Sequence, residues 1–280
     1  MIPHFDNKED LFKHLKANKA AILHSKKSQL KRGDNYSCLL PTLDKSGIEQ
    51  KDMGVSEDSL PTGKLRVKAV INTSNIMDSH CDVHIGNIWK KSLQELKYIV
   101  HLESHEQEFD AVISDTPNVT ASVKNLSWAS LGYPYEGNTQ ALIFDSIIEE
   151  SRNEYMYNQY RSGYVKNHSV GMQYVTLYMC INSDDKWYTE EKANWDKYYP
   201  SIVNKEMADA KGYFWAVTEA KLIEGSAVVL GSNPVTPTQS VEDYEDAGAV
   251  PTSEDKRKPS ADTHVNVIEA IGNFKFNFIN

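Results

Sequence analysis

A long extended segment is predicted by residues 164–181, which read YVKNHSVGMQYVTLYMCI. Apolar side chains recur at every second position over its second half, a period typical of a strand with one buried face. Val175, Leu177 and Met179 fall on that face, and Ser169 has the same parity. We therefore expect a strand that buries one side and turns Ser169 toward it.

The flanking sequence predicts a mixed α+β domain around this segment. Apolar residues at helical spacing run through residues 139–161, and Gly163 follows them, as is common just past a helix end. We therefore expect one long helix that leads directly into the extended segment. Shorter helices are expected at 8–18, at 88–96 and within 187–212, and further strands at 65–71, 109–114, 119–126, 212–219 and 220–230.

Composition divides the chain into three parts. Residues 1–63 form an N-terminal extension that ends in a linker with Pro, Gly and Ser, and residues 64–234 carry the regular apolar patterns of a folded domain. Residues 235–280 form an acidic tail. Its first part, 235–263, is rich in Pro, Ser, Thr, Asp and Glu and is expected to be disordered. Its last part, 264–280, alternates again and fits a docking strand or a binding peptide.

Bulk properties argue against several classes of function. The chain has 280 residues, a formal net charge of −9 and 40% hydrophobic residues, which are ordinary globular values apart from the acidity. An acidic surface repels a phosphate backbone, and no Gly-rich nucleotide loop occurs, so neither nucleic-acid binding nor nucleotide chemistry is expected. No apolar run approaches the ~20 residues that span a bilayer, and the polar N-terminus lacks a secretion signal. Three scattered cysteines predict free thiols in a cytoplasmic protein: Cys38, Cys81 and Cys180.

Three short segments carry residue types that suit serine hydrolase chemistry. They are 98–113 (YIVHLESHEQEFDAVI), 166–172 (KNHSVGM) and 221–234 (KLIEGSAVVLGSNP). A serine hydroxyl becomes a useful nucleophile only when a neighbouring base takes its proton, and histidine suits that task at neutral pH. A carboxylate or a second histidine on the other ring nitrogen then fixes the tautomer of the imidazole.

The content and order of these segments resemble the prohead maturation proteases of tailed phages, which share a fold with the herpesvirus assemblins. That family has a histidine in a segment like HLxxH, a serine in a segment like HSxGF, and a closing segment like ExSxVxxPANP. The resemblance covers about residues 64–235 of this chain. It implies that Ser169 is the nucleophile, that His105 is the base, and that Glu224 is the acidic residue of the closing segment.

The chain departs from the family pattern at two places. Met172 stands where phenylalanine is usual, and Gly231 and Ser232 stand where the closing segment has Pro-Ala. The third catalytic member also stays open, because the related assemblins have a histidine there. His168 and Glu219 are therefore alternatives to the acidic residue of the closing segment.

The resemblance also implies a fold and a biological role. The fold is an antiparallel β-barrel core flanked by helices, and Gly171 beside the nucleophile leaves room for a substrate backbone. The function is an endopeptidase without a cofactor that processes capsid and scaffold proteins, and its own chain, inside the immature phage prohead in the host cytoplasm. Assemblins dimerise, so a homodimer is one open state for this chain.

Two other readings of the same residues remain open. A non-catalytic capsid-assembly or scaffold protein would keep the fold without needing the serine and histidine. A zinc-dependent hydrolase would use four histidines: His80, His84, His101 and His105. The order His-Leu-Glu-Ser-His differs from the zincin motif, and the apolar neighbours of the last two histidines favour a strand, so the zinc reading is the weaker one.

Overall fold

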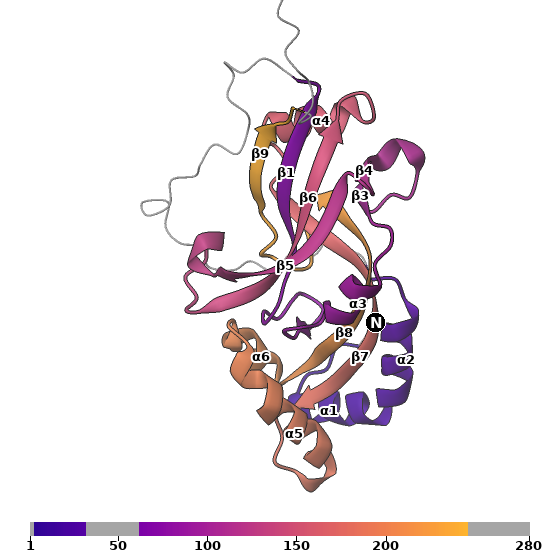
Figure 1. Ribbon diagram of the computed structural model, residues 1–280. Helices are drawn as coiled ribbons and strands as arrows, with labels where there is room; N and C mark the ends of the chain where they lie inside the picture. The colour runs from indigo at the N-terminus through magenta and orange to yellow at the C-terminus, as the bar shows by residue number, and fades with distance from the viewer. Residues whose placement is uncertain (1–2, 32–61, 246–280) are drawn as a thin grey trace, which may run out of the picture. The chain divides into compact units, whose positions relative to one another are not determined.

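The computed structural model describes residues 3–31 and 62–245, which form a mixed α+β structure as predicted (Figure 1). The described strands are β1 (Lys64–Thr73), β2 (Asp82–His84), β3 (Val100–Glu103), β4 (Val112–Asp115), β5 (Val119–Ser127), β6 (Asn138–Glu149), β7 (Asn167–Ile181), β8 (Tyr213–Val228) and β9 (Thr238–Asp243). The described α-helices are α1 (Lys8–Ala17), α2 (Lys19–Ser28), α3 (Lys90–Glu95), α4 (Glu154–Arg161), α5 (Thr189–Tyr198) and α6 (Lys205–Lys211). Short 3₁₀ turns lie at Phe109–Ala111, Ala129–Leu131, Lys186–Tyr188 and Tyr199–Ser201.

One sheet has four antiparallel strands in the order β5-β6-β1-β9. Residues 141–144 of β6 are buried on both faces, because two of them pack in the main hydrophobic core and the other two in a second apolar cluster, and such a strand lacks the alternation that identifies strands in a sequence. The prediction of one helix over 139–161 is therefore wrong in its first half, which β6 fills. Only α4 is helical there, and the side chain of Asn153 caps it by accepting a hydrogen bond from the N–H of Met156.

The second sheet is built on β8. Strand β7 runs antiparallel along one edge of β8, β2 and β3 run parallel to β8 along the other edge, and β4 pairs with β3. The expected antiparallel barrel is therefore wrong in detail: the described residues form two sheets, two of the strand pairs are parallel, and no barrel closes. The pairing of β2 and β3 with β8 joins strands far apart in the sequence, which the spacing of apolar residues does not reveal.

Strand β7 is interrupted by irregularities that change which residues face the core. Its pairing with β8 shifts between Gly171 and Met172 and on both sides of Thr176. Each extra residue turns the following side chains to the other face. Val175 is therefore 41% exposed, although it was expected beside Leu177 on the buried face.

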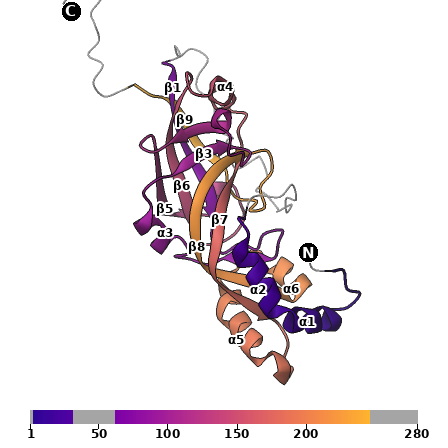
Figure 2. The ribbon, with the colours of Figure 1, turned by 90° about the vertical axis from the view of Figure 1, so that its right-hand side faces the viewer.

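Of the described helices, α4 lies near one end of the β7–β8 ribbon, α1, α2, α5 and α6 lie near the other, and α3 packs beside the middle of β8 (Figures 1 and 2). Both α2 and α5 pack on β7, and α6 packs on β8. Lys31, just after α2, exchanges two backbone hydrogen bonds of 2.7 and 3.0 Å with Met172 of β7. The described part of the predicted N-terminal extension, residues 3–31, is thus joined to the folded domain. Within the described ranges, no helix is long and apolar enough to cross a membrane.

Strand β9 shows that the predicted tail begins too early. Val235 is fully buried, and β9 pairs with the edge of β1, where Val241 lies opposite Val67. The sequence of β9, TQSVED, is polar because an edge strand is held by backbone hydrogen bonds and needs only one apolar face. The predicted disorder beyond residue 245 and the predicted docking segment 264–280 lie outside the described residues.

Candidate active site

Three adjacent strands carry the residues that the sequence singled out. β3 ends just before His105, β8 carries Glu224, and β7 carries Ser169. Because β8 lies between β3 and β7, the pairing places Leu102, Ser226 and Ser169 at one level across the sheet. Residues at one level of adjacent strands turn to the same face. The three motif segments therefore meet on one face of the second sheet.

A buried contact joins His105 and Glu224 on this face. Nδ1 of His105 lies 2.6 Å from Oε1 of Glu224, and the two residues are 5% and 1% exposed. Shelter from water strengthens a charge-assisted hydrogen bond of this kind. With a proton on Nδ1 directed at the carboxylate, Nε2 carries the lone pair that a general base uses.

Ser226 forms hydrogen bonds to both members of this pair. Its Oγ donates a hydrogen bond of 2.6 Å to Oε2 of Glu224 and accepts one of 3.2 Å from the backbone N–H of His105. Both carboxylate oxygens of Glu224 are thus engaged, which a buried carboxylate needs in order to remain charged at an acceptable free-energy cost. The arrangement fixes the direction of the imidazole as well as its partner.

Ser169 and Gly171 lie directly across the strand pair from this network. Ser169 pairs with Ser226, and Gly171 pairs with Glu224. Cβ atoms of directly opposed residues in antiparallel strands lie ~4.5–5.5 Å apart. Because Ser169 is opposite Ser226, its side chain lies on the same face of the sheet as the histidine–carboxylate pair, and the residue is 5% exposed.

Gly171 makes room for the carboxylate, which gives a first testable prediction. A Cβ atom at this position would lie 1.8 Å from Oε1 of Glu224, the oxygen that contacts His105. Gly171→Ala should therefore lower the free energy of unfolding by about 1–3 kcal/mol, as overpacking of a filled site does. Urea unfolding measures this change. Gly86→Ala is the control, because the nearest contact of a Cβ there is Gln140, at an ordinary 3.6 Å, and equal effects of the two variants would contradict the prediction.

The backbone that presents His105 adopts an uncommon conformation. Ser104 and His105 have φ angles of 50° and 63°, in the left-handed region that costs free energy for residues other than glycine. The turn is held because Ser104 N–H donates to the carbonyl of Ala227, and Glu106 N–H to that of Glu103. Conformations of this kind gather at functional sites, so this turn adds to the case for His105.

His101 and His168 lie on the opposite face of the same sheet. Nε2 of His101 and Nε2 of His168 lie 3.1 and 2.9 Å from the hydroxyl of Tyr160 in α4. Burial lowers the pKa of His101 to about 3 and that of His168 to about 4, so both are neutral at pH 7. His168, considered as a possible third catalytic member, therefore contacts Tyr160 and not the imidazole of His105.

Glu219, the other alternative, lies away from the site along β8. It pairs with Thr176 in the sheet and forms an ion pair of 3.4 Å with Lys91. Five residues of strand separate it from Glu224, a distance of about 16 Å at ~3.3 Å per residue. The structure therefore places Glu224, rather than Glu219, beside the imidazole of His105.

The four histidines of the zinc reading are dispersed. His84 of β2 pairs with Val217 and His101 of β3 with Gly225, positions eight residues apart on β8, or about 26 Å at ~3.3 Å per residue. His101 and His105 also serve opposite faces. Among the described residues, no group of three or more His, Cys, Asp or Glu side chains is placed to hold a metal ion.

The closing segment ties the start of β7 to the first sheet. The side chain of Asn233 accepts from the N–H of Val235 and donates to the carbonyl of Thr73, so it shapes the turn after β8. Thr236 then bonds to the backbone of His168, next to Ser169, through its carbonyl at 3.0 Å and its hydroxyl at 2.6 Å. Thr236, two residues after the segment that resembles the family's closing motif, thus helps to fix the position of the strand that carries the serine.

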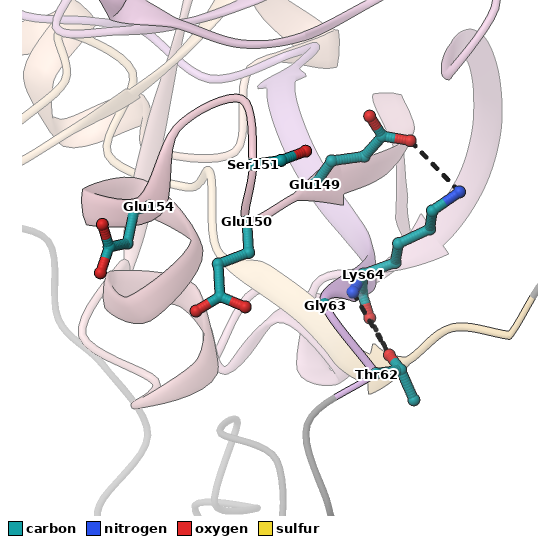
Figure 3. Close-up of a pocket in the computed structure, with 7 residues that line it drawn as sticks. All are labelled: Thr62, Gly63, Lys64, Glu149, Glu150, Ser151 and Glu154. Carbon is teal, nitrogen blue, oxygen red and sulfur yellow. Dashed lines mark hydrogen bonds and ion pairs between the residues drawn. The ribbon is translucent and has the colours of Figure 1, made fainter. Parts of the chain in front are cut away.

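Two cavities differ in their relation to this site. One of about 230 Å³ is lined by Glu224, by Leu102 of β3 and by the fully exposed Phe109, so it opens beside the histidine–carboxylate pair. A larger one of about 610 Å³, shown in Figure 3, lies where β1 begins and β6 ends, and two of the residues that line it, Lys64 and Glu149, form an ion pair of 3.3 Å. None of the residues that the sequence singled out for chemistry lines the larger cavity.

Two residues of the site went unassigned in the sequence. Ser226 stands in the closing segment two positions after Glu224, and this spacing on a strand was the available sign that the two share a face. Tyr160 lies in an aromatic-rich run with no distinguishing pattern.

Comparison with known proteins adds no relative, because no protein-family model, no curated protein and no solved structure matches this chain.

Proposed function

We propose that the chain is a serine endopeptidase in which Ser169 is the nucleophile, His105 the base, and Glu224 the group that orients the base. The observation that supports this most is the buried 2.6 Å contact between His105 Nδ1 and Glu224 Oε1, on the face of the sheet that carries Ser169. A histidine with a carboxylate on one ring nitrogen and a serine nearby is the arrangement that acyl transfer requires.

The reaction follows from the roles of these groups. Ser169 Oγ attacks the peptide carbonyl carbon while its proton passes to Nε2 of His105, and Glu224 stabilises the imidazolium that forms. The tetrahedral intermediate collapses as the C–N bond breaks, and the leaving amine takes the proton from His105. Water then attacks the acyl-enzyme with His105 again as base, which releases the carboxylic acid and restores Ser169.

The biological setting that we propose rests on the sequence resemblance. The substrates would be capsid and scaffold proteins, together with segments of the protease itself, inside the immature prohead. A fold with parallel strands beside β8 differs from the implied antiparallel barrel, so the resemblance supports this setting through its motifs and their order rather than through the detailed topology.

A fluorophosphonate probe tests the catalytic part of this proposal. The probe should attach covalently to the wild-type chain at one position, Ser169, because only an activated serine reacts with it readily. His105→Ala should react at least 100-fold more slowly, and Ser169→Ala should remain unlabelled. Intact-mass spectrometry followed by peptide mapping identifies the site.

The same experiment separates the enzyme from its main alternative. A wild-type chain that remains unlabelled at Ser169 under conditions where it is folded would remove the protease assignment. That outcome would favour the non-catalytic capsid-assembly or scaffold protein, which needs the fold but no reactive serine.

A further inference from the structure

The strands that carry the base and the nucleophile are not neighbours in the sheet. β3, which leads to His105, and β7, which carries Ser169, lie on opposite edges of β8. In this sheet, backbone hydrogen bonds join each of these two strands to β8 and do not join them to each other. On the face that carries Ser169, Glu224 contacts His105 and Ser226 contacts Glu224, but Glu224 and Ser226 both belong to β8 as well.

The reverse face of the sheet supplies a direct link between the two outer strands. His101 of β3 and His168 of β7 lie there with ring centroids 6.0 Å apart. Gly225 of β8 lies at the level of His101 between them, and a Cβ on it would lie 2.4 Å from the ring of Phe144. The hydroxyl of Tyr160 bonds to both histidines, so one atom of α4 connects β3 to β7 behind β8.

The hydrogen bonds of this link have one consistent direction. Nδ1 of His168 lies 3.1 Å from the carbonyl of Thr236, which can only accept, so Nδ1 carries the proton. Nε2 of the neutral His168 must then accept, and its donor is the hydroxyl of Tyr160. Having given its one proton, that hydroxyl accepts from Nε2–H of His101, and Nδ1 of His101 accepts from the hydroxyl of Ser146 at 3.1 Å.

Only a group that donates and accepts at the same atom can stand at the centre of this chain. Phenylalanine at position 160 would leave a buried N–H on His101 and a buried lone pair on His168 without their partner. Such buried groups are costly to leave unsatisfied, so one or both histidines would move. His101 lies four residues before His105, and His168 directly precedes Ser169, so a shift of either changes the catalytic spacing.

We propose that Tyr160 is a positioning residue that sets the distance between the base and the nucleophile from the reverse face of the sheet. This inference rests on the proposed serine peptidase activity. The effect acts through His101 and His168 and requires no contact with the substrate. A misplacement of about 1 Å at a reacting centre can cost about 100-fold in rate, so the expected effect is on the chemical step.

The test compares Tyr160→Phe with Tyr157→Phe. Tyr157 is a matched control, because it lies one turn earlier in α4 and is 1% exposed. The probe is a fluorophosphonate, and its reaction with Ser169 is resolved into an initial binding constant and a rate of covalent attachment. Tyr160→Phe should attach the probe at least tenfold more slowly than Tyr157→Phe, with the binding constant unchanged, at temperatures where both variants are folded.

A second measurement distinguishes positioning from a general loss of structure. Combining Tyr160→Phe with His168→Gln should slow the attachment little more than either change alone, because both break one chain of hydrogen bonds. Equal attachment rates in Tyr160→Phe and Tyr157→Phe, or a loss that follows the unfolded fraction, would overturn the role of Tyr160 alone. Failure of the wild-type chain to react at Ser169 would instead overturn the proposed function, and this role with it.

Discussion

Glu224→Gln should lower kcat/KM for hydrolysis of p-nitrophenyl acetate by about four orders of magnitude, as expected when the acidic member of a serine triad becomes an amide. Ser226 explains why an isosteric change has so large an effect. Its hydroxyl accepts from His105 N–H and donates to the side chain at position 224, so the oxygen of the new amide must face Ser226. The amide NH₂ then faces His105 Nδ1, which is forced to accept.

Glu224→Gln should therefore place the proton of the neutral His105 imidazole on the wrong nitrogen. A neutral His105 that accepts at Nδ1 carries its proton on Nε2, the nitrogen that must take the proton of Ser169. Glu219→Gln is the control, because this residue lies on the same strand but pairs with Lys91. Ser169→Ala gives the background rate. If Glu224→Gln keeps the activity of Glu219→Gln, then Glu224 has no role in orienting the base.

Local patterns were sufficient to predict parts of this fold. Strands at 65–71 and 119–126 are confirmed as β1 and β5, and the helix at 8–18 as α1. These predictions rested on the spacing of apolar residues, which matches the burial of Phe12 and Leu15 in α1, whereas β5 buries only Val119. Asn7 caps α1 by accepting a hydrogen bond from the N–H of Asp10.

Longer-range pairing limited the prediction of the rest. β6 was taken for a helix because separate apolar clusters bury both of its faces, and β9 was assigned to the tail because pairing with β1 leaves no mark on its composition. The expected barrel required strand partners that only the folded chain reveals. In each case the missing information is which other strand lies alongside.

For the candidate site too, the sequence indicated the residues but not their arrangement in space. The residue types and the order of the three segments pointed to Ser169, His105 and Glu224, but not to the face that each occupies. The choice between Glu224 and Glu219 required the register of β8 against its neighbours. Tyr160 could not be identified from the sequence, because its role depends on two histidines that come from β3 and β7.

Acidification from pH 6 to pH 5 should lower the free energy of unfolding by about 2–3 kcal/mol, because three buried histidines must become charged on unfolding. Burial lowers the pKa of His84 and His168 to about 4 and that of His101 to about 3. The unfolded chain has histidine pKa values near ~6.5. Below that pH the unfolded state binds protons that the folded state excludes, so the stability present above about pH 6.5 is lost as the pH falls toward 4.

The buried carboxyl of Asp78 changes the free energy of unfolding with pH in the opposite direction to the histidines. Burial, with the charge of Asp82 nearby, raises the pKa of Asp78 to about 7 from an ordinary 3.8. Between those values the folded state holds a proton that the unfolded state lacks, which favours folding as the pH falls. Three histidines less one carboxyl leave about two protons taken up on unfolding, and each is worth about 1.4 kcal/mol per pH unit.

Two variants should change the dependence of the free energy of unfolding on pH in opposite directions. His84→Gln removes one excluded proton and should roughly halve the loss of stability between pH 6 and pH 5. Asp78→Asn removes the opposing carboxyl and should increase that loss by about 1.4 kcal/mol per pH unit. Urea unfolding at pH 7, 6 and 5 measures the slopes. Because a mere loss of packing would lower stability equally at each pH, a parallel shift in both variants, or a flat wild-type curve, would show that these buried groups do not titrate as their burial implies.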